Sequence, residues 1–231
     1  MKKYSLALLL AITSLGLSAE DRRLENNGNL ILENIPPIPM SIKEELSKFQ
    51  NVRSAAFRGF SNTEDGVFIS TRFGNVSQLH YVGSPGAART QITYFQEPIG
   101  STSIHPTGSS IAFTMDKGGT ENAQIYLLDP DSASSRMLTD GASRNGGPLW
   151  NNAGDQLAFQ STKRNGRSND VWVMSSDDPE NSELILESPD GTWWGAADWS
   201  KDDQRVLIQN YISVSNSCLL YTSDAADECL S

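Results

Sequence analysis

The sequence predicts an all-β fold, a partial β-propeller of about 3.5 four-stranded blades with a short N-terminal helix. Two internal repeats predict this fold. A strand-like triplet recurs at intervals of 44, 46 and 49 residues, as Val67–Ile69, Ile111–Phe113, Leu157–Phe159 and Val206–Ile208. A second triplet recurs at intervals of 46 residues, beginning at Leu79, Ile125 and Val171. A period of about 45 residues with four short strands is typical of a propeller blade.

The residue types of the repeats explain why strands and turns alternate. β-branched and aromatic side chains suit a pleated, half-buried surface, and Gly or Asn supplies the positive φ that tight turns need. A third run recurs at Ile92–Thr93 and Leu138–Thr139, with Leu184–Leu186 in the next unit. Each first triplet follows a turn rich in Gly, Asp or Asn, at residues 64–66, 106–108, 152–154 and 201–203. A helical solenoid would show a period of 3.6 residues, and a β-sandwich has no reason to repeat every 46.

Residues 1–19 have the pattern of a secretory signal peptide. Lys2 and Lys3 precede an apolar stretch from Tyr4 to Leu17, and small residues follow. The alternative is an uncleaved membrane anchor, but these 14 positions fall short of the roughly 20 that cross a bilayer. The chain is therefore expected to be exported, to the periplasm or the medium.

Residues 20–50 are expected to form a lead-in segment to the first blade. Pro36–Pro39 predicts an extended, stiff stretch, and residues 41–49 predict a helix. Ser41 and Glu44 fit a capping box, while Ile42, Leu46 and Phe49 share one helix face. We expect this face to pack against the first blade.

The tail, residues 218–231, reads as a non-native addition. The stretch CLLYTSDAADE from Cys218 to Glu228 resembles the translation of a transposase-type sequencing adapter. We therefore do not interpret Cys218 and Cys229 as a disulfide of a secreted domain, although a natural acidic tail is the alternative. On this reading residues 51–217 are an incomplete propeller domain, too short for a ring of seven or eight blades.

Composition excludes two classes of function. The formal net charge is −10, with 28 acidic residues against 18 basic ones, so no broad basic face is available for nucleic acid. The mean hydropathy of −0.39 and a single apolar run exclude a polytopic membrane protein. We expect no membrane contact beyond the export signal.

The chain offers no catalytic, cofactor-binding or metal-binding residues that we would name. His80 corresponds by spacing to Tyr126 and Trp172, and we align His105 with Trp150 and Trp199. Residues that exchange with aromatics fill space, so we expect both histidines to pack rather than catalyse. The sequence contains no Gly-x-Ser-x-Gly motif and no phosphate loop. Acidic residues gather at expected turns, where Asp bonds its own backbone, at Asp129, Asp131, Asp177, Asp178, Asp202 and Asp203.

Two adjacent tryptophans, Trp193 and Trp194, would place one ring on each face of a strand. One ring could line a ligand surface, although packing between blades is favoured. Residues that bind a substrate stay unassigned from the sequence.

The repeats resemble the TolB-type propeller, with Ile125–Asp129 and Leu138–Thr139 as the clearest match. The lead-in residues 35–39 and 49–57, with 70–75 and 78–80, resemble exported bacterial members of the prolyl oligopeptidase family of serine peptidases. The resemblance runs from about residue 28 to 213. It implies a propeller that screens or positions peptides, followed by an α/β-hydrolase domain whose Ser, Asp and His would lie beyond residue 217. No cofactor is implied.

Two other functions remain open. A periplasmic TolB-like propeller would bind proteins without catalysis, and a propeller lyase or glycan-binding protein would carry aromatics and carboxylates at its channel mouth. The oligomeric state and substrate preference stay open as well, because a fold alone does not decide activity.

Overall fold

The computed structural model describes residues 22–63, 65–189, 192–213 and, for the backbone, 216–221. The predicted signal peptide at 1–19 lies outside the described residues, as do Cys229 and most of the predicted adapter-derived tail. Within the described part of the chain, no helix is long and apolar enough to cross a membrane.

Four antiparallel sheets follow one another along the chain, and we call them blades 1 to 4. Blade 1 contains β3 (Ala55–Phe60), β4 (Val67–Thr71), β5 (Gln78–Val82) and β6 (Thr90–Gln91). Blade 2 contains β7 (Ile99–Ile104), β8 (Ile111–Met115), β9 (Gln124–Leu128) and β10 (Ser135–Met137). Blade 3 contains β11 (Asn145–Trp150), β12 (Gln156–Ser161), β13 (Asp170–Ser175) and β14 (Glu183–Leu186). Blade 4 contains β15 (Trp193–Trp199), β16 (Val206–Ser213) and β17 (Asn216–Tyr221).

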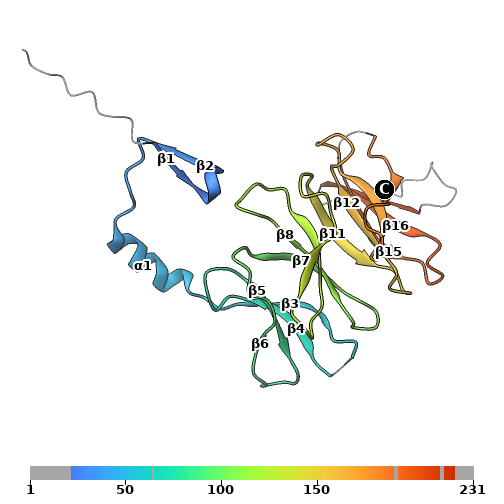
Figure 1. Ribbon diagram of the computed structural model, residues 1–231, viewed down its shortest axis with the longest axis horizontal. Helices are drawn as coiled ribbons and strands as arrows, with labels where there is room; N and C mark the ends of the chain where they lie inside the picture. The colour runs from blue at the N-terminus through green and yellow to red at the C-terminus, as the bar shows by residue number, and fades with distance from the viewer. Residues whose placement is uncertain (1–21, 64, 190–191, 214–215, 222–231) are drawn as a thin grey trace, which may run out of the picture.

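The strands of each blade lie in chain order, and the first strands lie at the centre. β3 contacts β7, β7 contacts β11, and β11 contacts β15, so these four strands form the inner wall of the array. In every blade a β-bulge interrupts the pairing of the first strand with the second. A bulge bends and twists its strand, which suits the crowded inner wall. Figure 1 shows the blades fanned around this wall.

The hydrophobic core consists of three clusters, and each lies between two consecutive blades. The first joins Phe68 and Leu79 of blade 1 to Ile111 and Phe113 of blade 2. The second joins blade 2 to blade 3 through Ala112, Ile125, Leu138, Trp150, Leu157, Phe159 and Met174. The third joins blade 3 to blade 4 through Ala158, Val171, Val173, Trp194, Val206 and Ile208. Face-to-face packing of blades is therefore the main source of burial in this fold.

This packing explains the recurring Ile-Ala-Phe triplet. Alternate residues of a strand point to opposite faces of its sheet. Ile111 and Phe113 point toward blade 1, whereas Ala112 between them belongs to the cluster shared with blade 3. The pattern is repeated one blade later, where Phe159 packs toward blade 2 and Ala158 toward blade 4. Large residues on one face thus meet small residues on the next blade.

The turns before the second strands have the positive φ expected of them. φ is 76° at Gly108, 80° at Gly154 and 57° at Asp203, the equivalent positions of blades 2, 3 and 4. A side chain at Gly154 would also collide with His105, because a Cβ there would lie 2.4 Å from His105 Nε2. Glycine at Gly154 is therefore required both by the positive φ and by the closeness of His105.

The lead-in segment differs from the sequence expectation in three ways. Residues 22–33 form a hairpin, β1 (Arg22–Glu25) and β2 (Leu30–Glu33), joined by a short 3₁₀ turn at Asn26–Gly28. Helix α1 spans Met40–Gln50, and Pro39 precedes it without any side-chain cap. The main-chain carbonyl of Pro39 accepts from the N–H groups of Ile42 and Lys43, so Ser41 lies inside the first turn and the predicted capping box is wrong. Finally, no residue of α1 is buried, so the expected packing against blade 1 is absent.

The third strand of blade 4 passes the boundary that we expected at residue 217. β17 pairs with β16 up to Tyr221, which lies opposite Leu207. Residues 218–221 therefore have a backbone position in the sheet. Pairing does not reveal the origin of these residues, because an apolar segment of any source can add to a free strand edge. The adapter reading stays a prediction.

Candidate binding site

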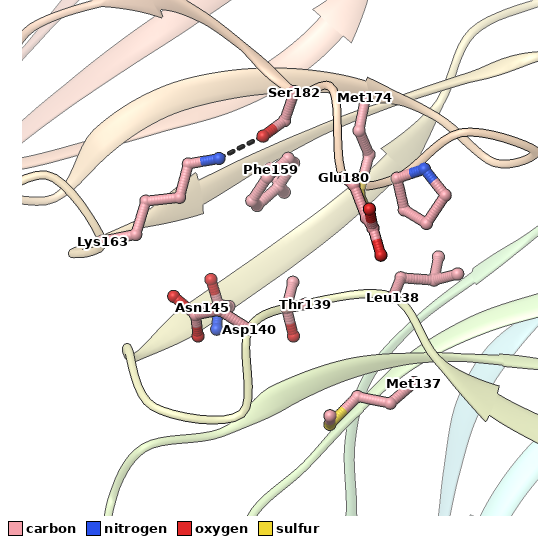
Figure 2. A pocket seen from close by; sticks show the side chains of 11 residues that line it. Met137, Leu138, Thr139, Asp140, Asn145, Phe159, Lys163, Met174, Glu180 and Ser182 are labelled. Carbon is pink, nitrogen blue, oxygen red and sulfur yellow. Dashed lines mark hydrogen bonds between the residues drawn. The ribbon is translucent and has the colours of Figure 1, made fainter.

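A cavity of about 380 Å³ lies between blades 2 and 3. One wall is formed by the segment that connects β10 to β11, with Leu138, Asp140 and Asn145. The other wall is formed by blade 3, with Phe159 and Lys163 from the region of β12 and further residues from β13 and the turn after it. Figure 2 shows Asn145 and Asp140 on one side and Lys163, Phe159 and Ser182 on the other. The cavity thus combines an apolar floor with polar groups on both walls.

Asn145 is the most deeply buried polar residue of this cavity, with 4% of its surface exposed. Its side-chain nitrogen donates to the main-chain oxygens of Ala123 and Ser143 and to the amide oxygen of Gln124. Because main-chain oxygens can only accept, these contacts fix which atom of the amide is nitrogen. The amide oxygen is buried, and none of the described residues donates a hydrogen bond to it.

Lys163 forms the opposite wall. Its ammonium lies 3.8 Å from the centre of the Trp172 ring and donates to Ser182 Oγ. Burial lowers the pKa of Lys163 from its ordinary value, and the nearby Asp140 carboxylate opposes this shift. Burial acts to raise the pKa of Asp140, but bonds from Ser143 and Ala142 outweigh it and leave that pKa lowered. The Asp140 carboxyl is therefore ionised at neutral pH.

A second cavity of about 250 Å³ opens on the inner wall and shares Asn145 with the first. It is lined by Arg144, Gln160, Asn169 and Trp193. Arg144 donates to the amide oxygen of Asn169 over 3.4 Å. Gly146 leaves room here, since a Cβ on it would lie 2.9 Å from the Gln160 amide.

The two adjacent tryptophans lie in different environments, one packed between blades and one at a cavity. The Trp194 ring is buried in the cluster between blades 3 and 4. The Trp193 side chain is 41% exposed, lines the inner-wall cavity and meets Tyr211 edge-on, with ring centres 6.3 Å apart. One ring packs and the other faces a cavity, as the alternation of a strand requires.

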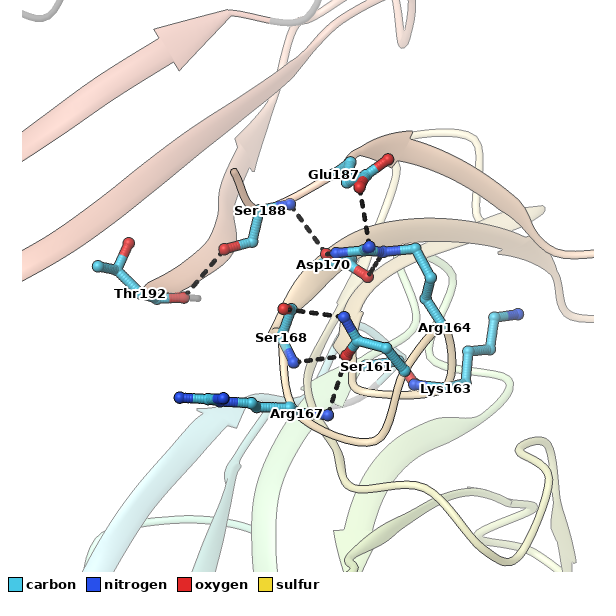
Figure 3. Close-up of polar contacts among 10 residues, drawn as sticks. Ser161, Lys163, Arg164, Arg167, Ser168, Asp170, Glu187, Ser188 and Thr192 are labelled. Atoms are coloured by element: carbon cyan, nitrogen blue, oxygen red, sulfur yellow. Dashed lines mark hydrogen bonds and ion pairs between the residues drawn. The ribbon is translucent and has the colours of Figure 1, made fainter. Parts of the chain in front are cut away.

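The loop between β12 and β13 carries groups of both cavities, and a buried ion pair holds it. Asp170 is fully buried and accepts from Arg164 through both oxygens, at 2.7 and 2.9 Å, and from the Ser188 N–H at 2.8 Å. Arg164 also contacts Glu187 at 2.8 Å near the surface. Figure 3 shows Arg164 between the two carboxylates. The loop that bears Lys163 and Asn169 is therefore tied to the segment after β14.

His80 fills space, as its spacing indicates. It lies opposite Ile69 in the sheet, the position that Tyr126 occupies opposite Phe113. The ring is 1% exposed and lies 5.3 Å from the Phe73 ring, centre to centre. Nδ1 bonds the main-chain oxygen of Gln78, whereas the buried Nε2 has no partner among the described residues.

We expect His80 to make the fold sensitive to mild acid. Burial lowers the pKa of His80 from 6.5, helped by the Arg89 charge and opposed by the bond to Gln78. The unfolded chain then binds more protons than the folded one, so stability is full above pH 6.5 and falls as the pH drops toward the folded pKa. In His80→Phe this loss should disappear, measured as the difference in urea midpoint between pH 7.5 and 5. The His105→Asn variant should keep it, and a wild-type midpoint equal at both pH values would contradict the prediction.

The structure corrects the position of His105. Ile104, not His105, pairs like Trp150 and Trp199, so His105 corresponds to Asn151 as the first residue of the turn. The alignment of His105 with Trp150 and Trp199 is therefore off by one residue, because it matches aromatic side chains and not positions in the strand pairing. His105 Nδ1 accepts from the Thr107 N–H, and Nε2 therefore donates to the Gly154 oxygen at 2.7 Å. His105 links the turns of blades 2 and 3, with its ring edge-on to Trp150.

The acidic residues singled out from the sequence all lie in loops or turns, as expected. Asp129 accepts from Asp131 N and from the Ser132 hydroxyl, and Asp202 accepts from Ser200 and Gln204 N. Asp203 has a further role that the sequence did not indicate. Its carboxylate accepts from the main-chain N–H groups of Asn152 and Ala153 and so joins blades 3 and 4. Among the described residues, no three His, Asp or Glu side chains gather as metal ligands would.

Three buried polar residues were missed, although the repeat contains a signal for them. Gln78, Gln124 and Asp170 are 46 residues apart, each directly before the second triplet. Gln78 donates to the main chain of Phe95 and Glu97, and Gln124 to that of Asn122 and Ser143. Each therefore holds the segment that leads into the next blade.

The radial sheets, the central first strands and the clusters between blades define a β-propeller. The all-β prediction with one short helix is confirmed, and three four-stranded blades and a three-stranded fourth are described. No protein-family profile and no curated protein sequence matches the chain.

Solved structures resemble the fold at low sequence identity. A structure from work on two prolyl endopeptidases has a TM-score of 0.58 and 11% identity, over 75% of this chain and 29% of that one. Putative TolB from Agrobacterium tumefaciens has a TM-score of 0.57 and 18% identity, over 87% of this chain and 76% of that one. An oligogalacturonate lyase solved with manganese has a TM-score of 0.54 and 10% identity, over 88% of this chain and 57% of that one. The fold is thus that of a TolB-like propeller, and this chain spans less than a third of the prolyl endopeptidase.

Proposed function

We propose that this chain is the N-terminal propeller region of an exported serine peptidase of the prolyl oligopeptidase family. In this proposal the propeller admits or positions peptides, and a hydrolase domain encoded after residue 217 cleaves them. There a serine would attack the peptide carbonyl while a histidine takes its proton; the amine then leaves with a proton, and water releases the acyl group. No residue of this chain has a part in those steps.

The lead-in segment is the observation that carries the proposal. Residues 35–39 and 49–57 resemble the peptidase family, whereas the repeats also fit propellers without catalysis. The structure adds that α1 exposes apolar Ile42, Leu46 and Phe49 and buries none of its residues. A further domain that covers this face fits a two-domain enzyme. The peptide-sized cavity between blades 2 and 3 supports a peptide-handling role.

A TolB-like binding module without catalysis is the second candidate. The likeness to putative TolB covers 76% of that chain, a larger share than for the prolyl endopeptidase. In this case the propeller would close into a ring and the reading frame would stop soon after it.

Reading the source gene in frame past Ser217 tests the two candidates. The proposal predicts a Gly-x-Ser-x-Gly motif on a strand-to-helix turn, with Asp and His after it. The purified full-length protein should react with a fluorophosphonate at that serine and hydrolyse a peptide. A stop codon directly after a closed propeller would overturn the proposal and favour the TolB-like module.

A further inference from the structure

The inner-wall cavity between blades 3 and 4 carries positive charge. Its volume is about 250 Å³, and Arg144 is the charged residue among the side chains that line it. No described carboxylate lines this cavity, although the whole chain has a formal net charge of −10. Such a cavity attracts an anion, because the cation on its wall has no counter-ion built in beside it.

Arg144 keeps most of its N–H groups without a partner among the described residues. Its side chain is exposed, and it donates to the amide oxygen of Asn169 over a long 3.4 Å. Arg164 is the contrast, since it is paired with both Asp170 and Glu187. A guanidinium with unpaired N–H groups binds a carboxylate through two parallel hydrogen bonds. Arg144 is therefore available for a carboxylate that comes from outside the chain.

Gln160 supplies a second polar group, and two glycines make room for it. Its side chain is half-buried, and both polar atoms of its amide are reachable from solvent and have no hydrogen-bond partner among the described residues. A Cβ on Gly146 of β11 would lie 2.9 Å from the amide nitrogen, and one on Gly195 of β15 would lie 2.5 Å from the amide oxygen. The amide thus offers both donors and an acceptor at the inner wall. Hydroxyl groups suit it, because each of them can donate and accept.

The Trp193 ring gives the same cavity a flat apolar surface. The side chain is 41% exposed and lines the cavity. A Cβ on Gly195 would lie 2.9 Å from the outer edge of this ring, so the ring and the Gln160 amide oxygen both lie beside Gly195. Tyr211 meets the indole edge-on, which leaves the faces of the indole free of that neighbour. An exposed indole face packs well against the C–H groups of a saturated ring.

We propose that the inner-wall cavity binds a sugar acid, a pyranose ring that carries a carboxylate. Arg144 pairs with the carboxylate, the Gln160 amide bonds hydroxyl groups, and a C–H face of the sugar ring lies on Trp193. The volume of about 250 Å³ is below the roughly 300 Å³ at which pockets for drug-sized ligands begin, which suits a single ring. This binding function is separate from peptide handling and needs no hydrolase domain.

Other anions leave part of the site unused. A phosphate ion can pair with Arg144 but has no C–H face for Trp193. A carboxylate without hydroxyl groups, such as the C-terminus of a peptide, leaves the Gln160 amide without partners in the complex, and an unpaired polar group in an interface costs affinity. A neutral sugar leaves the guanidinium unpaired for the same reason.

Fluorine NMR of the full chain labelled with 5-fluorotryptophan tests this assignment. The chain has five tryptophans, and Trp193→Phe identifies the Trp193 signal. The probe is methyl glucuronide, compared with methyl glucoside, which lacks the carboxylate, and with cyclohexanecarboxylate, which lacks the hydroxyl groups. We expect methyl glucuronide to shift the Trp193 signal and to bind at least about tenfold more tightly than either comparison ligand, because hydrogen bonds to a charged group are the strong ones.

Variants locate the group that recognises the carboxylate. Arg144→Gln removes the guanidinium and should bind methyl glucuronide no more tightly than methyl glucoside. Arg89→Gln, in an exposed turn of blade 1, is the matched control and should keep the preference of the wild type. If Arg144→Gln fails to fold, the comparison of the three ligands on the unchanged protein still decides.

Other outcomes would overturn the assignment. Equal affinity for methyl glucoside would show that no carboxylate is recognised, and equal affinity for cyclohexanecarboxylate would show that no hydroxyl group is recognised. A Trp193 signal that no ligand shifts would place any binding elsewhere, and tighter binding of N-acetylleucine would assign the cavity to a peptide C-terminus. None of these readouts depends on hydrolysis, so they can fail while the peptidase proposal stands, and the reverse holds too.

Discussion

Replacing Phe113 with alanine is expected to lower the free energy of unfolding by about 4 kcal/mol. Phe113 is fully buried, and its ring lies 5.5 Å from the rings of both Tyr126 and Phe95, centre to centre. It belongs to the cluster that joins blade 1 to blade 2. The alanine variant leaves a cavity between blades 1 and 2 where the Phe113 ring was, and the facing sheets hold its walls apart. Urea denaturation followed by tryptophan fluorescence measures the loss.

Phe49→Ala is the matched control for this prediction. Phe49 lies in α1 and is 79% exposed, so the same change of residue there should alter stability by less than about 0.5 kcal/mol. Equal effects of the two substitutions would contradict the account, because they would mean that the blades are not held together by their facing side chains.

Asp170→Ala should be the most destabilising polar substitution, with a loss of about 3 kcal/mol. Asp170 is fully buried, and its removal leaves the Ser188 N–H without its acceptor and Arg164 without its main partner. The loop that carries Lys163 should loosen at the same time. Amide hydrogen exchange over residues 162–169 and the urea midpoint together measure the effect.

The control for Asp170→Ala is a substitution of Glu187, the other carboxylate that contacts Arg164. Glu187 contacts Arg164 at 2.8 Å, but its side chain is 61% exposed, and exposed ion pairs add little to stability. Glu187→Ala should therefore leave both the midpoint and the exchange of the loop near the wild-type values. A large loss in Glu187→Ala with none in Asp170→Ala would reverse the roles that the structure gives them.

Blade architecture could be predicted from the sequence because its signals are local. The triplets and the turn glycines such as Gly108 and Gly154 repeat at blade length, and each acts through the conformation of a few residues. The hairpin at residues 22–33 was missed, although Asn26-Asn27-Gly28 is a turn signal of the same local kind. The capping box failed because Pro39 is the residue that caps the helix, two positions before the expected cap at Ser41.

The candidate site could not be predicted from local sequence signals, because it depends on contacts between blades. The orientation of the Asn145 amide is fixed by partners from blade 2 that accept from its nitrogen. Lys163 meets Trp172 only after β12 and β13 have paired. His105 shows the same limit, since its role follows from pairing register rather than from residue type. Contacts between blades are set by three-dimensional packing, which spacing along the chain does not encode.

A nuclear Overhauser experiment on the Ala112 methyl group tests the face-to-face packing of blades most directly. Ala112 lies on β8 of blade 2, and its cluster contains Trp150 and Phe159 of blade 3. We predict cross-peaks from the Ala112 methyl protons to ring protons of Phe159 or Trp150. Cross-peaks confined to residues of blade 2, with none to blade 3, would contradict the propeller packing on which the cavity and the proposed function depend.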